Sequence, residues 1–215
     1  MTTTTVRERP IIFTAESVRA ILNGRKTQMR RALRVPDHPA VADWVLDSEF
    51  RAAARPHSEN VARQYVTTFP YGRVPCRFGR PGDRLWVREA WCPTFNSTLF
   101  RASCADDLPS ENTDDWDAPV DDRWRSPLHM PRGRSRLTLE VVRVRVERLH
   151  QISRADVLAE GIEPGLIEHY EKFFHKHDAP GLAFAHVWNP INAKRGYGWD
   201  TDPWVWVVEF KRATP

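Results

Sequence analysis

The chain has 215 residues, 41% of them hydrophobic and 28% charged, a composition that excludes wholesale disorder. It has no run of about 18 apolar residues and no apolar segment near Met1, so we expect neither a transmembrane helix nor a signal peptide. Three cysteines without a CxxC spacing predict reduced thiols in a cytoplasmic protein. The net charge is only +4, but residues 1–35 carry eight basic and two acidic side chains, which favours an anionic partner.

The N-terminal part predicts a strand, a helix and a second strand. Residues 9–14 are typical of a short strand, and Thr14 is a suitable cap for a helix from Ala15 to Asn23. Gly24 ends that helix, and residues 25–31 lead into the next strand. Five prolines within residues 36–80, with little periodicity, indicate a long insertion with one short helix.

A strand pattern covers residues 84–91 and places Glu89 on the same face as Leu85 and Val87. If that face is the core, Glu89 is a buried acid, which must be paired or protonated. It is therefore either a site residue or half of a structural ion pair with an arginine, and the pattern leaves both open. Residues 98–103 predict a further short strand, and the acidic stretch 105–122 a solvated loop.

The longest strand pattern covers residues 135–149. Its apolar side chains change phase between Val141 and Val142, which predicts a β-bulge and a bent strand. Ser153 is a cap for a helix ending near Glu160, and Gly161 follows it. Further helices are expected from Pro164 to about 177 and over 181–194 with a break at Pro190, before a doubly covered strand over 203–211.

These elements predict one α+β domain over residues 1–215, a small mixed β-barrel with surrounding helices and long insertions at about 36–80 and 104–126. The first and last strands are both expected in its core. Neither a phosphate-binding glycine motif nor a GxSxG nucleophile motif is present. His169, His175 and His177 are interpreted as a solvated helix end, so we expect no metal and no cofactor.

The most specific pattern is residues 24–31, GRKTQMRR, in which Gly24, Lys26 and Arg31 match the GxKxxExR signature of the ASCH superfamily. The segments RPIIF, PGDRLWVRE, HMPR, SRLTLEV and WVWVVEFK, in that order, also resemble the larger ASCH proteins of phages and prophages. The resemblance implies a PUA-like barrel whose signature residues line a cleft, and an RNA, DNA or modified-nucleotide partner.

Small members of that superfamily hydrolyse the amide of N4-acetylcytidine with a lysine, a threonine three residues later and a distant glutamate. The resemblance maps these positions to Lys26, Met29 and Glu160. Met29 is a departure, because a thioether cannot attack a carbonyl. An alternative amidohydrolase would need Thr27 or a water activated by Lys26, Glu160 or Glu89.

Binding is less affected by this departure and is the leading hypothesis. Arginine suits phosphate or base-edge contacts, and tryptophan can stack a base. The expected binding residues are Lys26, Arg30, Arg31, Trp86, Arg88, Arg132 and Trp199. A basic rim is expected from Arg30, Arg132, Arg134 and Arg136. A ribonuclease activity is a third hypothesis, suggested by some relatives only.

Overall fold

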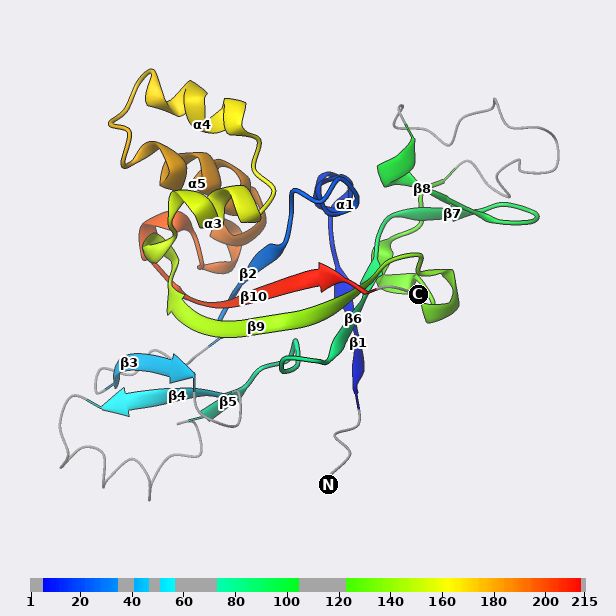
Figure 1. Cartoon of the computed structure of the whole chain (residues 1–215), viewed down its shortest axis with the longest axis horizontal. Helices are drawn as coiled ribbons and strands as arrows, with labels where there is room; N and C mark the ends of the chain where they lie inside the picture. Colours follow the sequence, from blue (N-terminus) through cyan, green and yellow to red (C-terminus); the bar gives the residue numbers. More distant parts are fainter. Residues whose placement is uncertain (1–5, 35–40, 47–50, 57–72, 105–122, 214–215) are drawn as a thin grey trace.

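The computed structural model describes residues 6–34, 41–46, 51–56, 73–104 and 123–213 (Figure 1). They form an α+β structure around a five-stranded sheet of order β1-β6-β9-β10-β2. The strands are β1 (Glu8–Ile12), β6 (Arg84–Arg88), β9 (Thr138–Arg148), β10 (Trp204–Arg212) and β2 (Gln28–Ala32). β1 is parallel to β6 and the other pairs are antiparallel, so the sheet is mixed.

The sheet is open across the described residues, because β1 and β2 form its two edges and no ladder joins them. The expected small barrel is therefore not closed by backbone hydrogen bonds in this part of the chain. The prediction of β1 as a core strand is also wrong. It pairs only with β6, and of its five side chains only Ile11 is buried.

β10 is covered on both faces, as its sequence predicts. On one face, Trp206 and Val208 pack with Val18 and Ile21 of α1 (Ala15–Leu22). On the other face, Val205 contributes to a second core with three helices, α3 (Arg154–Ala159), α4 (Pro164–Glu171) and α5 (Ala179–Asn192). These three helices gather on one side of the sheet in Figure 1. Alternation along β10 thus decides which side chains meet α1 and which meet α3–α5.

The predicted bulge in β9 is confirmed. Glu209 is paired with Arg143 and Phe210 with Val141, which leaves Val142 as the extra residue of β9. Val142 is 49% exposed, whereas Val141 and Val144 on either side of the bulge are buried. The bulge explains the change of phase, and Figure 1 shows β9 as a long curved strand.

The described residues of the insertion at 36–80 form strands, and the one short helix expected in the insertion is not among them. They form a small antiparallel sheet of β3 (Val41–Leu46), β4 (Arg51–Pro56) and β5 (Arg73–Pro75). β3 lies beside β9. The strand expected over 98–103 is shorter, because β8 (Thr98–Phe100), which pairs with β7 (Trp91–Pro93), ends in the 3₁₀ turn η1 (Arg101–Ser103). The acidic residues 105–122 lie outside the described residues.

The helical region also departs from expectation. α4 ends at Glu171 rather than near 177, and α5 continues through Pro190 instead of breaking there. A proline removes one helical N–H donor, but the helix before it is held by the buried side chains of Phe184 and Trp188. Among the described helices, none has the length and apolarity needed to cross a membrane.

Candidate functional site

Lys26 and Glu160 are brought together by two glycine-terminated helices. α1 is capped by Thr14 and followed by Gly24 at φ +75°, which turns the chain toward β2. α3 is capped by Ser153 and ends at Ala159, with Glu160 as its C-cap and Gly161 at φ +86° after it. The backbones of Lys26 and Glu160 then meet in an antiparallel bridge.

The two side chains form a buried ion pair, a contact that the sequence leaves open. The Lys26 Nζ donates to Glu160 Oε2 at 2.8 Å and to the Glu160 carbonyl oxygen at 2.6 Å. Both side chains are under 10% exposed. Burial lowers the pKa of Lys26 below that of a free lysine, and the Glu160 carboxylate opposes the shift only in part.

Arg30 connects this pair to acids on the same side of the sheet. Its Nη1 donates to Glu160 Oε1 at 3.2 Å, and its Nη2 contacts Glu147 of β9 and Asp156 of α3. The Arg30 side chain is fully buried, and its Nε has no hydrogen-bond partner among the described residues. Arg30 is therefore held inside the structure and does not project from a basic rim.

Arg145 of β9 completes the cluster from the other side. It donates to Gln28, to Glu147, to Asp156 and to Glu209 of β10. We call the whole set the buried charge cluster; its members are Lys26, Gln28, Arg30, Arg145, Glu147, Asp156, Glu160 and Glu209. The cluster contains four carboxylates and three cations, which are paired with one another.

Asp156 accepts hydrogen bonds from three residues of the chain. Burial by itself raises the pKa of Asp156, but hydrogen bonds from Ser153 and Gln28 and the charge of Arg30 outweigh it, and the pKa lies below its ordinary value of 3.8. Gln28 donates to Asp156 Oδ1 at 3.0 Å and accepts from Arg145. Both ends of the Gln28 amide are thus engaged, which fixes its orientation.

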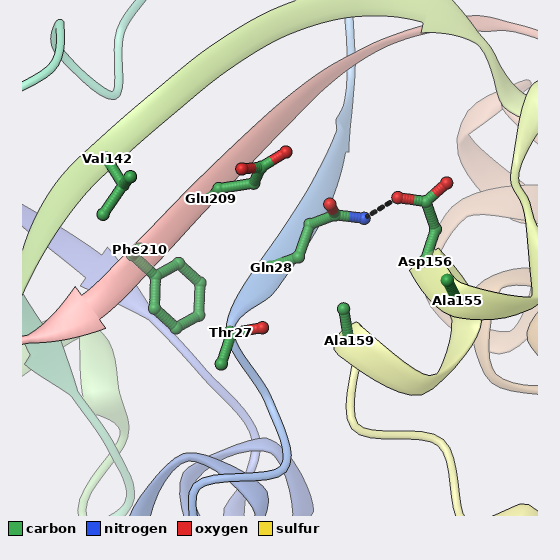
Figure 2. Close-up of a pocket in the computed structure, with 8 residues that line it drawn as sticks. All are labelled: Thr27, Gln28, Val142, Ala155, Asp156, Ala159, Glu209 and Phe210. Carbon is green, nitrogen blue, oxygen red and sulfur yellow. Dashed lines mark hydrogen bonds between the residues drawn. The ribbon is translucent and has the colours of Figure 1, made fainter.

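A pocket of about 320 Å³ opens beside this cluster, between α3 and the β9–β10 pair (Figure 2). Its polar lining is Thr27, Gln28, Asp156 and Glu209. Its apolar lining is Val142, Ala155, Ala159 and Phe210. The bulge at Val142 contributes one wall, so the predicted irregularity of β9 shapes the pocket. Lys26 and Glu160 are not among its lining residues.

Arg31 lies on the opposite face of β2 from Arg30. Its Nη2 donates to the Ile12 carbonyl at 2.7 Å, and its guanidinium lies 5.6 Å from the centre of the Phe13 ring. The Lys26 Nζ is 6.0 Å from the centre of the same ring. The two signature cations therefore share Phe13, but Arg31 belongs to the side of the sheet that packs on α1.

Met29 also faces that side and is 1% exposed in the core. The position that resembles the family's threonine nucleophile is therefore a packing position in this chain. Thr27, two residues earlier, is exposed and lines the pocket.

Glu89 is buried, as predicted, and its two oxygens each accept a 2.9 Å hydrogen bond from Arg136. Of the two alternatives that the sequence left open, the structure supplies the ion pair. No contact between described residues joins Glu89 to Lys26, so the three expected catalytic residues do not form one group.

The expected tryptophans are covered by the protein itself. Trp86 is 8% exposed, and the guanidinium groups of Arg88 and Arg132 lie 4.5 and 5.9 Å from its ring centre. Trp199 packs on His150 with ring centres 4.4 Å apart and belongs to the core between β10 and α5. Trp86 is buried and Trp199 is half-buried, and the two indoles belong to different parts of the molecule.

Five members of the buried charge cluster are not predicted from the sequence: Gln28, Arg145, Glu147, Asp156 and Glu209. A sequence signal existed for two of the cluster's members, because Gln28 and Arg30 alternate on a strand with Met29 between them. The described residues contain no group of three or more histidines, cysteines or acids placed to hold a metal ion. No protein-family model matches the sequence, and no curated protein or solved structure matches it significantly.

Proposed function

We propose that this protein is a PUA-like protein of the ASCH type that binds a nucleotide or modified nucleobase in the pocket between α3 and the β9–β10 pair. The observation that carries the proposal is the composition of the pocket wall. Fixed hydrogen-bonding groups on one side, from Gln28, Asp156 and Glu209, face the apolar side chains of Val142 and Phe210 on the other.

This wall suits a base better than a phosphate. Carboxylate oxygens accept hydrogen bonds and repel a phosphate group. Glu209 accepts from Arg145 through Oε1, so its Oε2 can accept from the amino edge of a base. The apolar residues provide contact for the flat face of the ring, and a pocket of about 320 Å³ has the size of a small-ligand site. The phosphate of a bound nucleotide would then point out of the pocket, toward solvent.

The Lys26–Glu160 pair has a positioning role in this proposal. It joins the end of α3 to the start of β2, and both elements carry residues of the pocket wall. Arg30 forms ion pairs with both Glu160 and Asp156, so it also holds the end of α3 against β2. The signature residues thereby hold the pocket without touching its ligand.

Titration calorimetry with cytidine, N4-acetylcytidine, adenosine and uridine tests the proposal. We expect the amino- or amide-bearing nucleosides to bind and uridine to bind more weakly. Thr27→Val removes one hydroxyl from the wall and should weaken the best ligand by up to about tenfold, the value of one hydrogen bond. Thr201→Val, an exposed threonine elsewhere, is the matched control. Absence of binding by all four nucleosides, or equal binding by the Thr27 variant, overturns the proposal.

Amide hydrolysis is a second candidate, favoured by the 2.8 Å contact between Lys26 and Glu160 and by the lowered pKa of Lys26. In this reaction a water oxygen adds to the acyl carbon of an N-acylated base and gives its proton to the Lys26–Glu160 pair. The C–N bond then breaks, and the proton passes to the departing nitrogen, which leaves the free base and a carboxylic acid.

Mass spectrometry of N4-acetylcytidine incubated with the protein tests this candidate. Release of cytidine that is abolished in Lys26→Ala supports it, and the absence of release from the unaltered protein rejects it for this substrate. Because Met29 is in the core, Met29→Thr should add no activity.

A further inference from the structure

Several apolar side chains of the helical layer face solvent. Phe173 and Phe174, in the turn after α4, are 70% and 51% exposed, and Val187 and Ile191 of α5 are 43% and 40% exposed. Figure 1 shows α4 at the outer edge of this layer, away from the five-stranded sheet. The phenylalanines of the two cores are at most 6% exposed: Phe13, Phe78, Phe184 and Phe210. Phe173 and Phe174 are therefore exposed in a fold that otherwise buries this side chain in its cores.

These side chains lie side by side on α4 and α5. The Tyr170 ring of α4 lies 6.0 Å from the Phe174 ring, and the Tyr170 hydroxyl is 3.4 Å from His186 Nδ1 of α5. Val187 follows His186 in the helix, and Ile191 lies one turn further along. We call the set the aromatic patch; its members are Tyr170, Phe173, Phe174, His186, Val187 and Ile191. Single exposed apolar residues are common, but a contiguous group of them indicates a surface that another molecule covers.

The backbone fixes the turn that carries the two phenylalanines. The N–H groups of Phe173 and Phe174 both donate to the Tyr170 carbonyl oxygen, at 3.1 and 3.0 Å. The His169 ring lies 5.4 Å from the Phe173 ring and 5.8 Å from the Tyr170 ring. The patch is thus presented in one conformation, which reduces the entropy that is lost when a partner covers it.

The charged residues that border the patch have both signs. Glu168 of α4, and Lys172 and Lys176 after it, are exposed, and none of the three forms an ion pair with another described residue. The neighbouring Glu171, in contrast, pairs with Arg154 of α3. A strongly acidic partner would be repelled by Glu168, and a strongly basic partner would be repelled by the two lysines. The partner that fits this border carries both signs in the same places.

We propose that the aromatic patch is the interface of a homodimer, in which the turn after α4 packs on the same turn of a second copy. A two-fold axis places the same surface on both partners, so every contact occurs twice. Glu168 precedes the two phenylalanines in the sequence, and Lys176 follows them. An antiparallel arrangement about an axis at the phenylalanines therefore brings Glu168 of each copy toward the lysines of the other.

The exposed area is of the size that a weak dimer needs. At 70% and 51% exposure, Phe173 and Phe174 present about 200–250 Å² of surface. A standard interface buries about 800 Å² on each partner, so the two phenylalanines supply roughly a quarter to a third of that area. The rest would come from Val187, Ile191 and the charged border. We therefore expect a dimer that forms at micromolar concentration and dissociates on dilution.

Sedimentation velocity of the protein between about 1 and about 200 μM measures this equilibrium. We expect the sedimentation coefficient to rise with concentration toward that of a dimer. Phe173→Ser/Phe174→Ser should raise the dimer Kd by at least about tenfold, because it removes the apolar centre of the interface. Phe95→Ser is the matched control, since Phe95 is 74% exposed in the β7–β8 turn and outside the patch. This control should leave the Kd unchanged.

Two charge variants test the two-fold arrangement itself. Glu168→Lys, and separately Lys172→Glu/Lys176→Glu, each place like charges opposite one another in the dimer. Each variant by itself should therefore dimerise at least about tenfold more weakly than the unaltered protein. An equimolar mixture of the two variants restores opposite charges in the mixed dimer and should associate about as tightly as the unaltered protein. This recovery would also show that both variants are folded.

Three results would overturn the homodimer. The first is an unaltered protein that stays monomeric up to about 200 μM. The second is an unchanged Kd of the phenylalanine variant, and the third is a mixture of the charge variants that associates no better than either alone. If the monomeric protein instead sediments with phosphatidylserine vesicles, the patch belongs to a lipid surface, because exposed phenylalanines beside lysines also suit an anionic membrane.

Dimerisation is independent of the proposed function, because the aromatic patch shares no residue with the pocket. The phenylalanine variant should therefore bind nucleosides as the unaltered protein does, and Thr27→Val should dimerise normally. Loss of nucleoside binding alone would reject the pocket, and loss of the dimer alone would reject the interface.

Discussion

Replacement of Glu160 by glutamine tests whether one buried carboxylate holds two cations. In the structure Glu160 accepts from Lys26 Nζ at 2.8 Å and from Arg30 Nη1 at 3.2 Å, with 5% of its side chain exposed. Glutamine keeps the shape and one acceptor oxygen but removes the charge. Breaking a buried pair on one side typically costs about 3–5 kcal/mol, because the remaining charge stays buried.

Urea unfolding followed by tryptophan fluorescence measures this destabilisation, since the chain has nine tryptophans. With a urea dependence of about 2 kcal/mol per M, the midpoint of the Glu160→Gln variant should fall by about 1.5–2.5 M. Glu163→Gln is the matched control. Glu163 pairs with Arg25 at 2.7 Å but is 66% exposed, so its replacement should cost at most about 1 kcal/mol.

The pH dependence of the variant's stability provides a second, independent test of the buried pair. Without the carboxylate, the pKa of Lys26 should fall further below its ordinary value of 10.5. Between the folded and the unfolded pKa the unfolded chain binds the extra proton, so the stability of the variant should rise with pH and its deficit should shrink as the pH rises toward the ordinary lysine pKa of 10.5. A Glu160→Gln variant within about 1 kcal/mol of the unaltered protein, or with a deficit that grows with pH, would refute the buried pair.

Three further predictions use the same unfolding assay. Gly161→Ala should destabilise the fold by more than about 1–2 kcal/mol, the cost of a left-handed alanine, because its Cβ would lie 2.9 Å from the Lys26 Cβ. The control Gly165→Ala meets open space and should be neutral or slightly stabilising. Equal effects of the two substitutions would contradict the close approach. Met29→Thr should cost about 2–4 kcal/mol and Met29→Leu less than about 1.5 kcal/mol, and a tolerated threonine would show that Met29 is not in the core. The pKa of Asp156 is lowered in the folded state, so its contribution to stability is complete above about pH 4 and disappears on acidification. The Asp156→Asn variant should be less stable than the unaltered protein at about pH 7, but its stability should decline less between about pH 4 and about pH 2. A parallel decline in the stability of both proteins would show that Asp156 is not held as described.

The signature residues show which features of the site the local sequence can predict. Thr14 and Ser153 cap helices, and Gly24 and Gly161 end them, where the sequence predicts. These local rules suffice to place Lys26 after one helix and Glu160 at the end of another. The sequence leaves open whether the two residues meet, and the tertiary structure supplies the contact.

Strand periodicity is equally informative for burial. It predicts an inward Glu89, a doubly covered β10 and the bulge at Val142, because each depends only on which side chains alternate along one strand. Periodicity does not predict the order of the strands in the sheet. For this reason β1 forms as predicted but lies at the edge of the sheet and not at its centre.

The sequence by itself therefore determined the local features of this protein: the helix caps, the turns, the covered strand and the bulge. These follow from backbone conformation and from side-chain alternation, which neighbouring residues decide. Only the tertiary structure decided which charges meet. Arg30, expected on a binding rim, is sealed among Glu147, Asp156 and Glu160, and Trp86 is covered by Arg88 and Arg132. The partners of Arg30 lie more than 100 residues away in the sequence, on another strand and a helix. The periodicity of one segment cannot predict such distant contacts.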